Sequence, residues 1–116
     1  MESSQETQHL FAWAKAGETF CAAAPSWYEF LCGPVTADQI KVMSAFLTGG
    51  ILPFDSVRAQ LAAQLFNATM RLRRLRVDAM IAATAIEQKA ALATLNISDF
   101  KLFVPHGLEL ATGGNI

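Results

Sequence analysis

The sequence predicts an α/β fold in which helices cover both faces of a parallel sheet. Short apolar segments of strand length alternate along the chain with longer segments that have helical spacing. The 116 residues contain no repeat, low-complexity tract or linker, so residues 1–116 are expected to form a single domain. With 53% hydrophobic and 16% charged residues, the composition is that of a chain with a buried core.

Five helices are expected where apolar residues recur at helical spacing, at residues 6–16, 26–33, 36–49, 55–72 and 77–89. Ser26 with Glu29, and Thr36 with Gln39, have the spacing of a capping box, in which each side chain satisfies a free backbone N–H group of the other residue. Asp55 is well suited to cap the fourth helix. The fifth helix is almost wholly small and apolar, so we expect it in the core.

Strands are expected at the short apolar segments 19–24, 51–54, 91–94, 102–104 and 108–110, with a single helical turn at 98–101. Alternation of such strands with helices is typical of a parallel sheet. Ligands of these sheets bind beyond the carboxyl ends of the strands, where loops meet the starts of helices. Candidate functional residues are therefore sought at those positions.

Charge and cysteine usage exclude several classes of protein. Nine Lys and Arg against ten Asp and Glu give a formal charge of −1, which excludes a generally basic nucleic-acid binder. Cys21 and Cys32 form no CxxC motif and are far in sequence from His9 and His106, so neither a zinc site nor a disulfide scaffold is expected. Both histidines are expected at the surface. The chain shows no secretory signal and no apolar run of about 20 residues, so a cytoplasmic protein without a membrane partner is expected.

Three acidic residues stand near the ends of predicted strands or the starts of predicted helices. Glu29 follows the first strand, Asp78 opens the core helix, and Asp99 lies beyond the strand that ends at Thr94. If the strands are parallel, the three acids gather at one edge of the sheet. Neighbouring carboxylates raise each other's pKa unless a cation lies between them, and Mg²⁺ or Mn²⁺ prefers such oxygen ligands. Such an ion orients water for the hydrolysis of a phosphodiester.

Each acid also has a purely structural interpretation. Glu29 suits the N3 member of a capping box with Ser26, and Asp78 suits a cap at the positive end of its helix. Asp99 suits a turn. Taken singly, none of the three points to catalysis.

Several short motifs occur along this chain in the order found in one known family. They are WYEFLCG at 27–33, ILPFD at 51–55, DAMIAATA at 78–85, TLNISDF at 94–100 and GLEL at 107–110. Together they resemble PIN domains, and most closely the VapC-type toxins of bacterial toxin–antitoxin pairs. The resemblance covers residues 10–112 and is most specific in the DAMIAATA and TLNISDF motifs.

The resemblance implies a Mg²⁺- or Mn²⁺-dependent endoribonuclease. Glu29, Asp78 and Asp99 would be its catalytic, metal-binding acids, and Thr94 and Asn96 would orient the acids and the water. It also implies RNA as the substrate, a homodimer, and a small VapB-like antitoxin as the partner.

One part of the family pattern has no counterpart in this sequence. PIN domains open with an apolar strand that ends in Asp, lies at the centre of the sheet and supplies the first metal ligand. The chain therefore resembles an N-terminally truncated PIN domain, in which the neighbouring strands would have unpaired backbone groups. A start codon assigned too far downstream, a degenerate copy, and repair by dimerisation or exchange of elements all stay open. The alternative function is a catalytically inactive PIN-like module that self-associates or binds an antitoxin, and an unrelated α/β fold is the third possibility.

Four arginines fall between positions 71 and 76. Arg74 and Arg76 are predicted to bind RNA phosphates beside the acidic site. The alternative is a solvated helix end, where arginines suit the negative pole of the helix.

Overall fold

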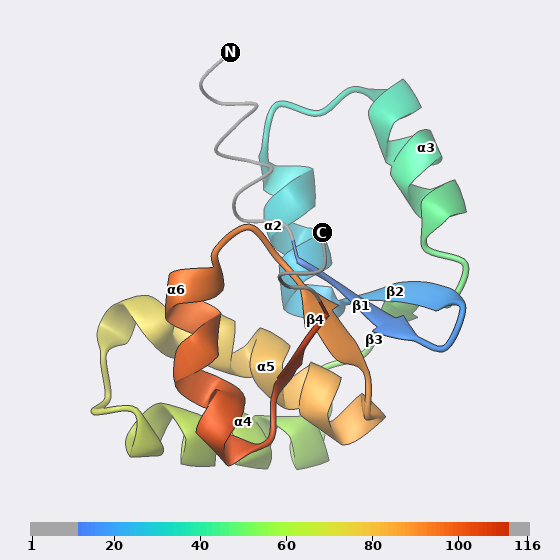
Figure 1. The fold of residues 1–116 in the computed structure, drawn as a ribbon. Coiled ribbons are helices and arrows are strands. Elements are labelled where there is room, and N and C mark those ends of the chain that lie inside the picture. The colour runs from blue at the N-terminus through green and yellow to red at the C-terminus, as the bar shows by residue number, and fades with distance from the viewer. Residues whose placement is uncertain (1–11, 112–116) are drawn as a thin grey trace.

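The structure, a computed structural model, describes residues 12–111 and has an α/β fold. Five strands form one mixed sheet in the order β3-β2-β1-β4-β5 (Figure 1). The strands are β1 (Trp13–Ala16), β2 (Thr19–Ala23), β3 (Ile51–Leu52), β4 (Ala91–Ala93) and β5 (Glu109–Leu110). Strand β1 is antiparallel to both β2 and β4, whereas β2 pairs with β3, and β4 with β5, in parallel.

Helices occupy most of the remaining described residues. They are α2 (Ala24–Cys32), α3 (Ala37–Phe46), α4 (Ser56–Ala68), α5 (Arg76–Gln88) and α6 (Ile97–Phe100), with the 3₁₀ helices η1 (Arg73–Leu75) and η2 (Lys101–His106). Helices α4 and α5 pack side by side, and α5 also contacts β2 and β4 (Figure 1). Among the described residues, no helix is both long and apolar enough to cross a bilayer.

The centre of the sheet differs from the sequence-based expectation. A helix was predicted at 6–16 and a wholly parallel sheet around it, but residues 13–16 form the antiparallel strand β1, and residues 1–11 lie outside the described range. Gly17 ends no helix. Its φ of +64° instead serves the two-residue turn that joins β1 to β2, where a positive φ is commonly required. Strand β1 therefore pairs with the backbone groups that the sequence analysis expected to be unpaired.

The predicted strand at 102–104 is also wrong, because these residues belong to η2. Leu102 and Val104 are exposed while Phe103 is completely buried, so the exposure alternates as it does along a strand although the backbone is helical. Helix α4 ends at Ala68, before the predicted position 72.

Successive residues of β2 face opposite sides of the sheet and join different clusters. Ala23 packs in the main core together with Leu92 of β4 and the apolar residues of α4 and α5. Ala22 packs on the other side with Phe30 of α2 and with Leu47. Helical residues therefore cover apolar side chains on both sides of this strand.

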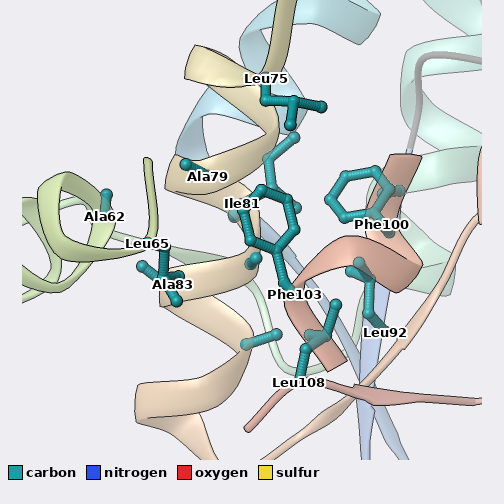
Figure 2. Close-up of a cluster of buried hydrophobic side chains, with 14 residues drawn as sticks. Ala62, Leu65, Leu75, Ala79, Ile81, Ala83, Leu92, Phe100, Phe103 and Leu108 are labelled. Atoms are coloured by element: carbon teal, nitrogen blue, oxygen red, sulfur yellow. The ribbon is translucent and has the colours of Figure 1, made fainter. Parts of the chain in front are cut away.

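The main core is built around α5, as the sequence predicts (Figure 2). Figure 2 shows side chains from α5, β4 and η2 converging, with Ile81, Leu92 and Phe103 among them. Six residues of α5 are buried, namely Ala79, Ile81, Ala82, Ala83, Thr84 and Ala85. The four alanines among them let α4 and the sheet approach the helix closely, and Asp78 lies in the first turn of the helix held in this way.

Candidate functional site

Three acids from three separate helices line one cavity of about 520 Å³. Glu29 comes from α2, Asp78 from the first turn of α5, and Asp99 from α6. The other lining residues are Arg73, Arg74, Arg76, Val77, Met80 and Asn96. The packing of α5 against both α2 and α6 brings together residues that are far apart in the sequence.

Glu29 is available to this cavity because it is not a capping residue. Helix α2 begins at Ala24 with Ala23 as its N-cap, so the predicted start at Ser26 is wrong. The Ser26 hydroxyl is completely buried, and it donates to the Ala12 carbonyl at 2.7 Å and accepts from the Ala12 N–H at 3.0 Å. Burial raises the pKa of the Glu29 carboxyl above its usual range.

Asp78 lies at the electrostatic centre of the three acids. The N-cap of α5 is Leu75 and no side chain caps this helix, so Asp78 is not its N-cap. Burial, as the largest cause, raises the pKa of Asp78 to about 6. The negative charges of Asp99 and then Glu29 add to this rise, and the positive charge of Arg74 opposes it. The Asp78 carboxyl therefore experiences both of the other acids, which is the electrostatic sign of a shared site.

Asp99 is held in place by neighbours on both of its oxygens. The Asn96 side-chain amide donates to Asp99 Oδ2 at 3.2 Å, and the backbone N–H of Asn96 donates to Thr94 Oγ1 at 3.0 Å. Thr94 thus fixes the backbone of Asn96, whose side chain orients Asp99. On the other oxygen, Arg74 Nη2 forms an ion pair with Asp99 Oδ1 at 3.3 Å.

The arginine run does not lie at the C-terminal end of an α-helix. Met70 and Arg71 have positive φ angles, so the backbone after α4 is not helical at these two residues. Arg76 is the first residue of α5 and lies at the positive pole of that helix. Arg74 and Arg76 line the cavity, as does Arg73, which the sequence analysis did not single out. Arg71 does not line it and lies instead over the ring of Phe66.

The carboxylates of this cavity suit a Mg²⁺ or Mn²⁺ ion that keeps several of its water ligands. Within residues 12–111, no group of three or more Asp, Glu, His or Cys side chains is arranged to hold an ion. Mg²⁺ commonly retains several waters and binds one or two carboxylates directly. Asp78, with its strongly perturbed carboxyl, and Glu29 fit such a hydrated ion, whereas Asp99 is already paired with Arg74.

A second cleft of about 390 Å³ adjoins the acidic cavity, and sequence reasoning missed it. Its wall includes Tyr28 of α2 and Phe54, and it shares Glu29, Val77 and Met80 with the acidic cavity. Apolar residues at helical spacing resemble core positions, so no signal in the sequence distinguished Val77 and Met80 from the buried residues of α5.

None of the histidines and cysteines in the described range lines the cavity. His106 is exposed in η2, and His9 lies outside the described residues. Cys21 is buried and Cys32 is exposed, and both are free thiols.

Comparisons with known proteins add no family. No protein-family model matches the chain, and no curated protein matches it.

Proposed function

We propose that this protein is a PIN-like, Mg²⁺- or Mn²⁺-dependent endoribonuclease of the VapC toxin type. The observation that carries the proposal is the single cavity in which Glu29, Asp78 and Asp99 meet three arginines. Carboxylates suit a hard cation and an attacking water, and guanidinium groups suit the phosphates of RNA. The charges therefore match both components of metal-assisted phosphodiester hydrolysis.

The roles of the residues follow from their surroundings. Asp78 and Glu29 would hold the ion, and Asp99 would contact it or its water in an orientation set by Asn96. Arg74 and Arg76 would bind the phosphate backbone. When bound, the ion supplies Lewis-acid activation of water and stabilises the developing oxyanion. At neutral pH a carboxyl with a pKa of about 6 is mostly ionised, so Asp78 is ready to bind a cation.

A catalytically inactive PIN-like module is the second candidate function. The ion pair of Arg74 with Asp99 favours it, as does the lack of a ready three-ligand group among residues 12–111. Such a module would keep surfaces for self-association or for an antitoxin and would not cleave RNA.

Calorimetric titration with Mn²⁺ distinguishes the two functions. We expect the unmodified protein to bind Mn²⁺ and to cleave RNA in its presence, and Asp78→Asn to lose both properties because the central carboxylate is gone. The matched control is Asp38→Asn, the same chemical change at an exposed acid of α3 that does not line the cavity. Absence of both Mn²⁺ binding and cleavage in the unmodified protein would favour the inactive module.

A further inference from the structure

The apolar cleft beside the acidic cavity is part of the same surface. Glu29, Val77 and Met80 line both hollows, so the two are continuous along the start of α5. Beyond these shared residues, Pro25, Tyr28 and Phe54 line the cleft. Its volume of about 390 Å³ and that of the acidic cavity, about 520 Å³, both fall within the range of small-ligand sites.

The two hollows differ in chemistry. Three arginines and three carboxylates line the acidic cavity, whereas Glu29 is the only charged residue in the described wall of the cleft. Tyr28 is 68% exposed and lines the cleft, so its aromatic ring is accessible to a ligand there. A ligand that spans both hollows therefore needs an anionic part next to a flat apolar part.

We propose that the cleft binds the base of one RNA nucleotide whose phosphate lies against the arginines of the acidic cavity. The inference rests on the proposed function and names the part of the substrate that the apolar wall recognises. Each nucleotide places a phosphate beside a base with an aromatic face, and aromatic side chains stack on bases with little preference for sequence. Tyr28 provides the stacking surface, and Phe54 and Met80 provide the apolar wall.

Charge complementarity favours RNA over an apolar protein segment. Of the three cavity arginines, only Arg74 takes part in an ion pair within residues 12–111. Arg73 and Arg76 thus offer positive charge to an incoming phosphate, whereas an apolar peptide in the cleft would leave that charge unmatched.

Fluorescence anisotropy with a labelled single-stranded RNA oligonucleotide tests the proposal. The titration is made in EDTA, so that binding is measured without hydrolysis. We expect Tyr28→Ala to weaken RNA binding on the order of tenfold, because one stacked base is lost. Tyr28→Phe keeps the ring and should bind as the unmodified protein does. Val42→Ala, at an exposed apolar position of α3, is the surface control.

A second measurement isolates the base from the phosphate. In NMR titrations, the unmodified protein should prefer uridine 5′-monophosphate to ribose 5-phosphate, and Tyr28→Ala should abolish that preference. Tyr28 is exposed, so its replacement leaves the core intact.

Three outcomes would overturn the inference. If Tyr28→Ala and the unmodified protein bind RNA with equal affinity, the cleft does not bind a base. The nuclease proposal would stand, because Mn²⁺ binding and cleavage are measured separately. If Tyr28→Ala binds an apolar peptide more weakly than the unmodified protein does, and binds RNA equally well, the cleft binds a protein partner instead. No RNA binding by the unmodified protein would overturn both proposals.

Discussion

At the scale of single residues, burial and charge decide what Asp78 does. Its carboxyl is partly removed from water and lies near two other acids, so its protonated form is favoured more strongly in the folded protein than in the unfolded chain. The sequence predicted that the three acids would meet, because strand ends and helix starts mark the ligand edge of an α/β sheet. It did not predict the Arg74 ion pair, because side-chain partners 25 residues apart have no local signature.

The pH dependence of stability follows from the raised pKa of Asp78. Between its usual value of 3.8 and about 6, the folded state binds more protons at this site than the unfolded chain does. The contribution of Asp78 therefore lowers the free energy of unfolding as the pH rises through this window. We expect Asp78→Asn to flatten this fall and to be more stable than the unmodified protein at neutral pH.

Urea unfolding of both proteins at a series of pH values is the measurement. Asp38→Asn, the same chemical change at an exposed residue of α3, is the matched control. Identical pH profiles for Asp78→Asn and the unmodified protein would mean that burial and the neighbouring acids do not raise the pKa of Asp78.

At the scale of helices and strands, two of the three predicted helix caps form and the third does not. The capping box of Thr36 and Gln39 is confirmed, with hydrogen bonds of 2.8 and 3.1 Å, and Asp55 caps α4. Ser26 has the same local pattern, yet it bonds to Ala12, 14 residues away. Strand β1 was missed for a related reason, since pairing with two strands outweighs the weak helical preference of a short segment.

Ser26→Ala should weaken the attachment of α2 to the segment before β1. Among the described residues, the Ser26 hydroxyl is the only side chain that hydrogen-bonds to the buried N–H and C=O groups of Ala12, and the change removes it. Leaving one buried polar group without a hydrogen bond costs about 1–3 kcal/mol. We expect the free energy of unfolding to fall by about 2 kcal/mol in urea denaturation. Ser44→Ala, at an exposed position of α3, should change it little. Equal stability of the two variants would contradict the observed role of Ser26.

At the scale of the whole molecule, the meeting of the three acids in one cavity was predictable although part of the sheet was not. Strand β1 is antiparallel to β2 and to β4, so β2 and β4 still run in the same direction. The segments that follow these two strands therefore leave the sheet at the same edge, which is where α2 and the Thr94–Asp99 segment contribute to the cavity. The adjoining cleft was not predictable, because it depends on how α2, α5 and the loop residue Phe54 pack together.

The main core should carry much of the stability of the molecule. Phe103 is completely buried against α5 and the sheet (Figure 2). Phe103→Ala should lower the free energy of unfolding by about 3–5 kcal/mol, through lost burial and the cavity left behind. Leu102→Ala, at the neighbouring exposed position of η2, should cost much less. Thermal or urea unfolding makes the comparison, and similar losses would contradict the burial of Phe103 and the exposure of Leu102.

The antiparallel placement of β1 also affects how the chain can fold while it is being translated. The residues of the β1–β2 hairpin leave the ribosome almost together, and because their contacts are local in sequence the hairpin can form early. The other edge of β1 pairs with β4, whose residues lie far along the chain from β1 and are translated much later. Until then the nascent chain presents an open strand edge, a feature that invites misassociation with other chains. Slow translation between these two segments would prolong that exposure, and a chaperone that covers the early hairpin would shorten it.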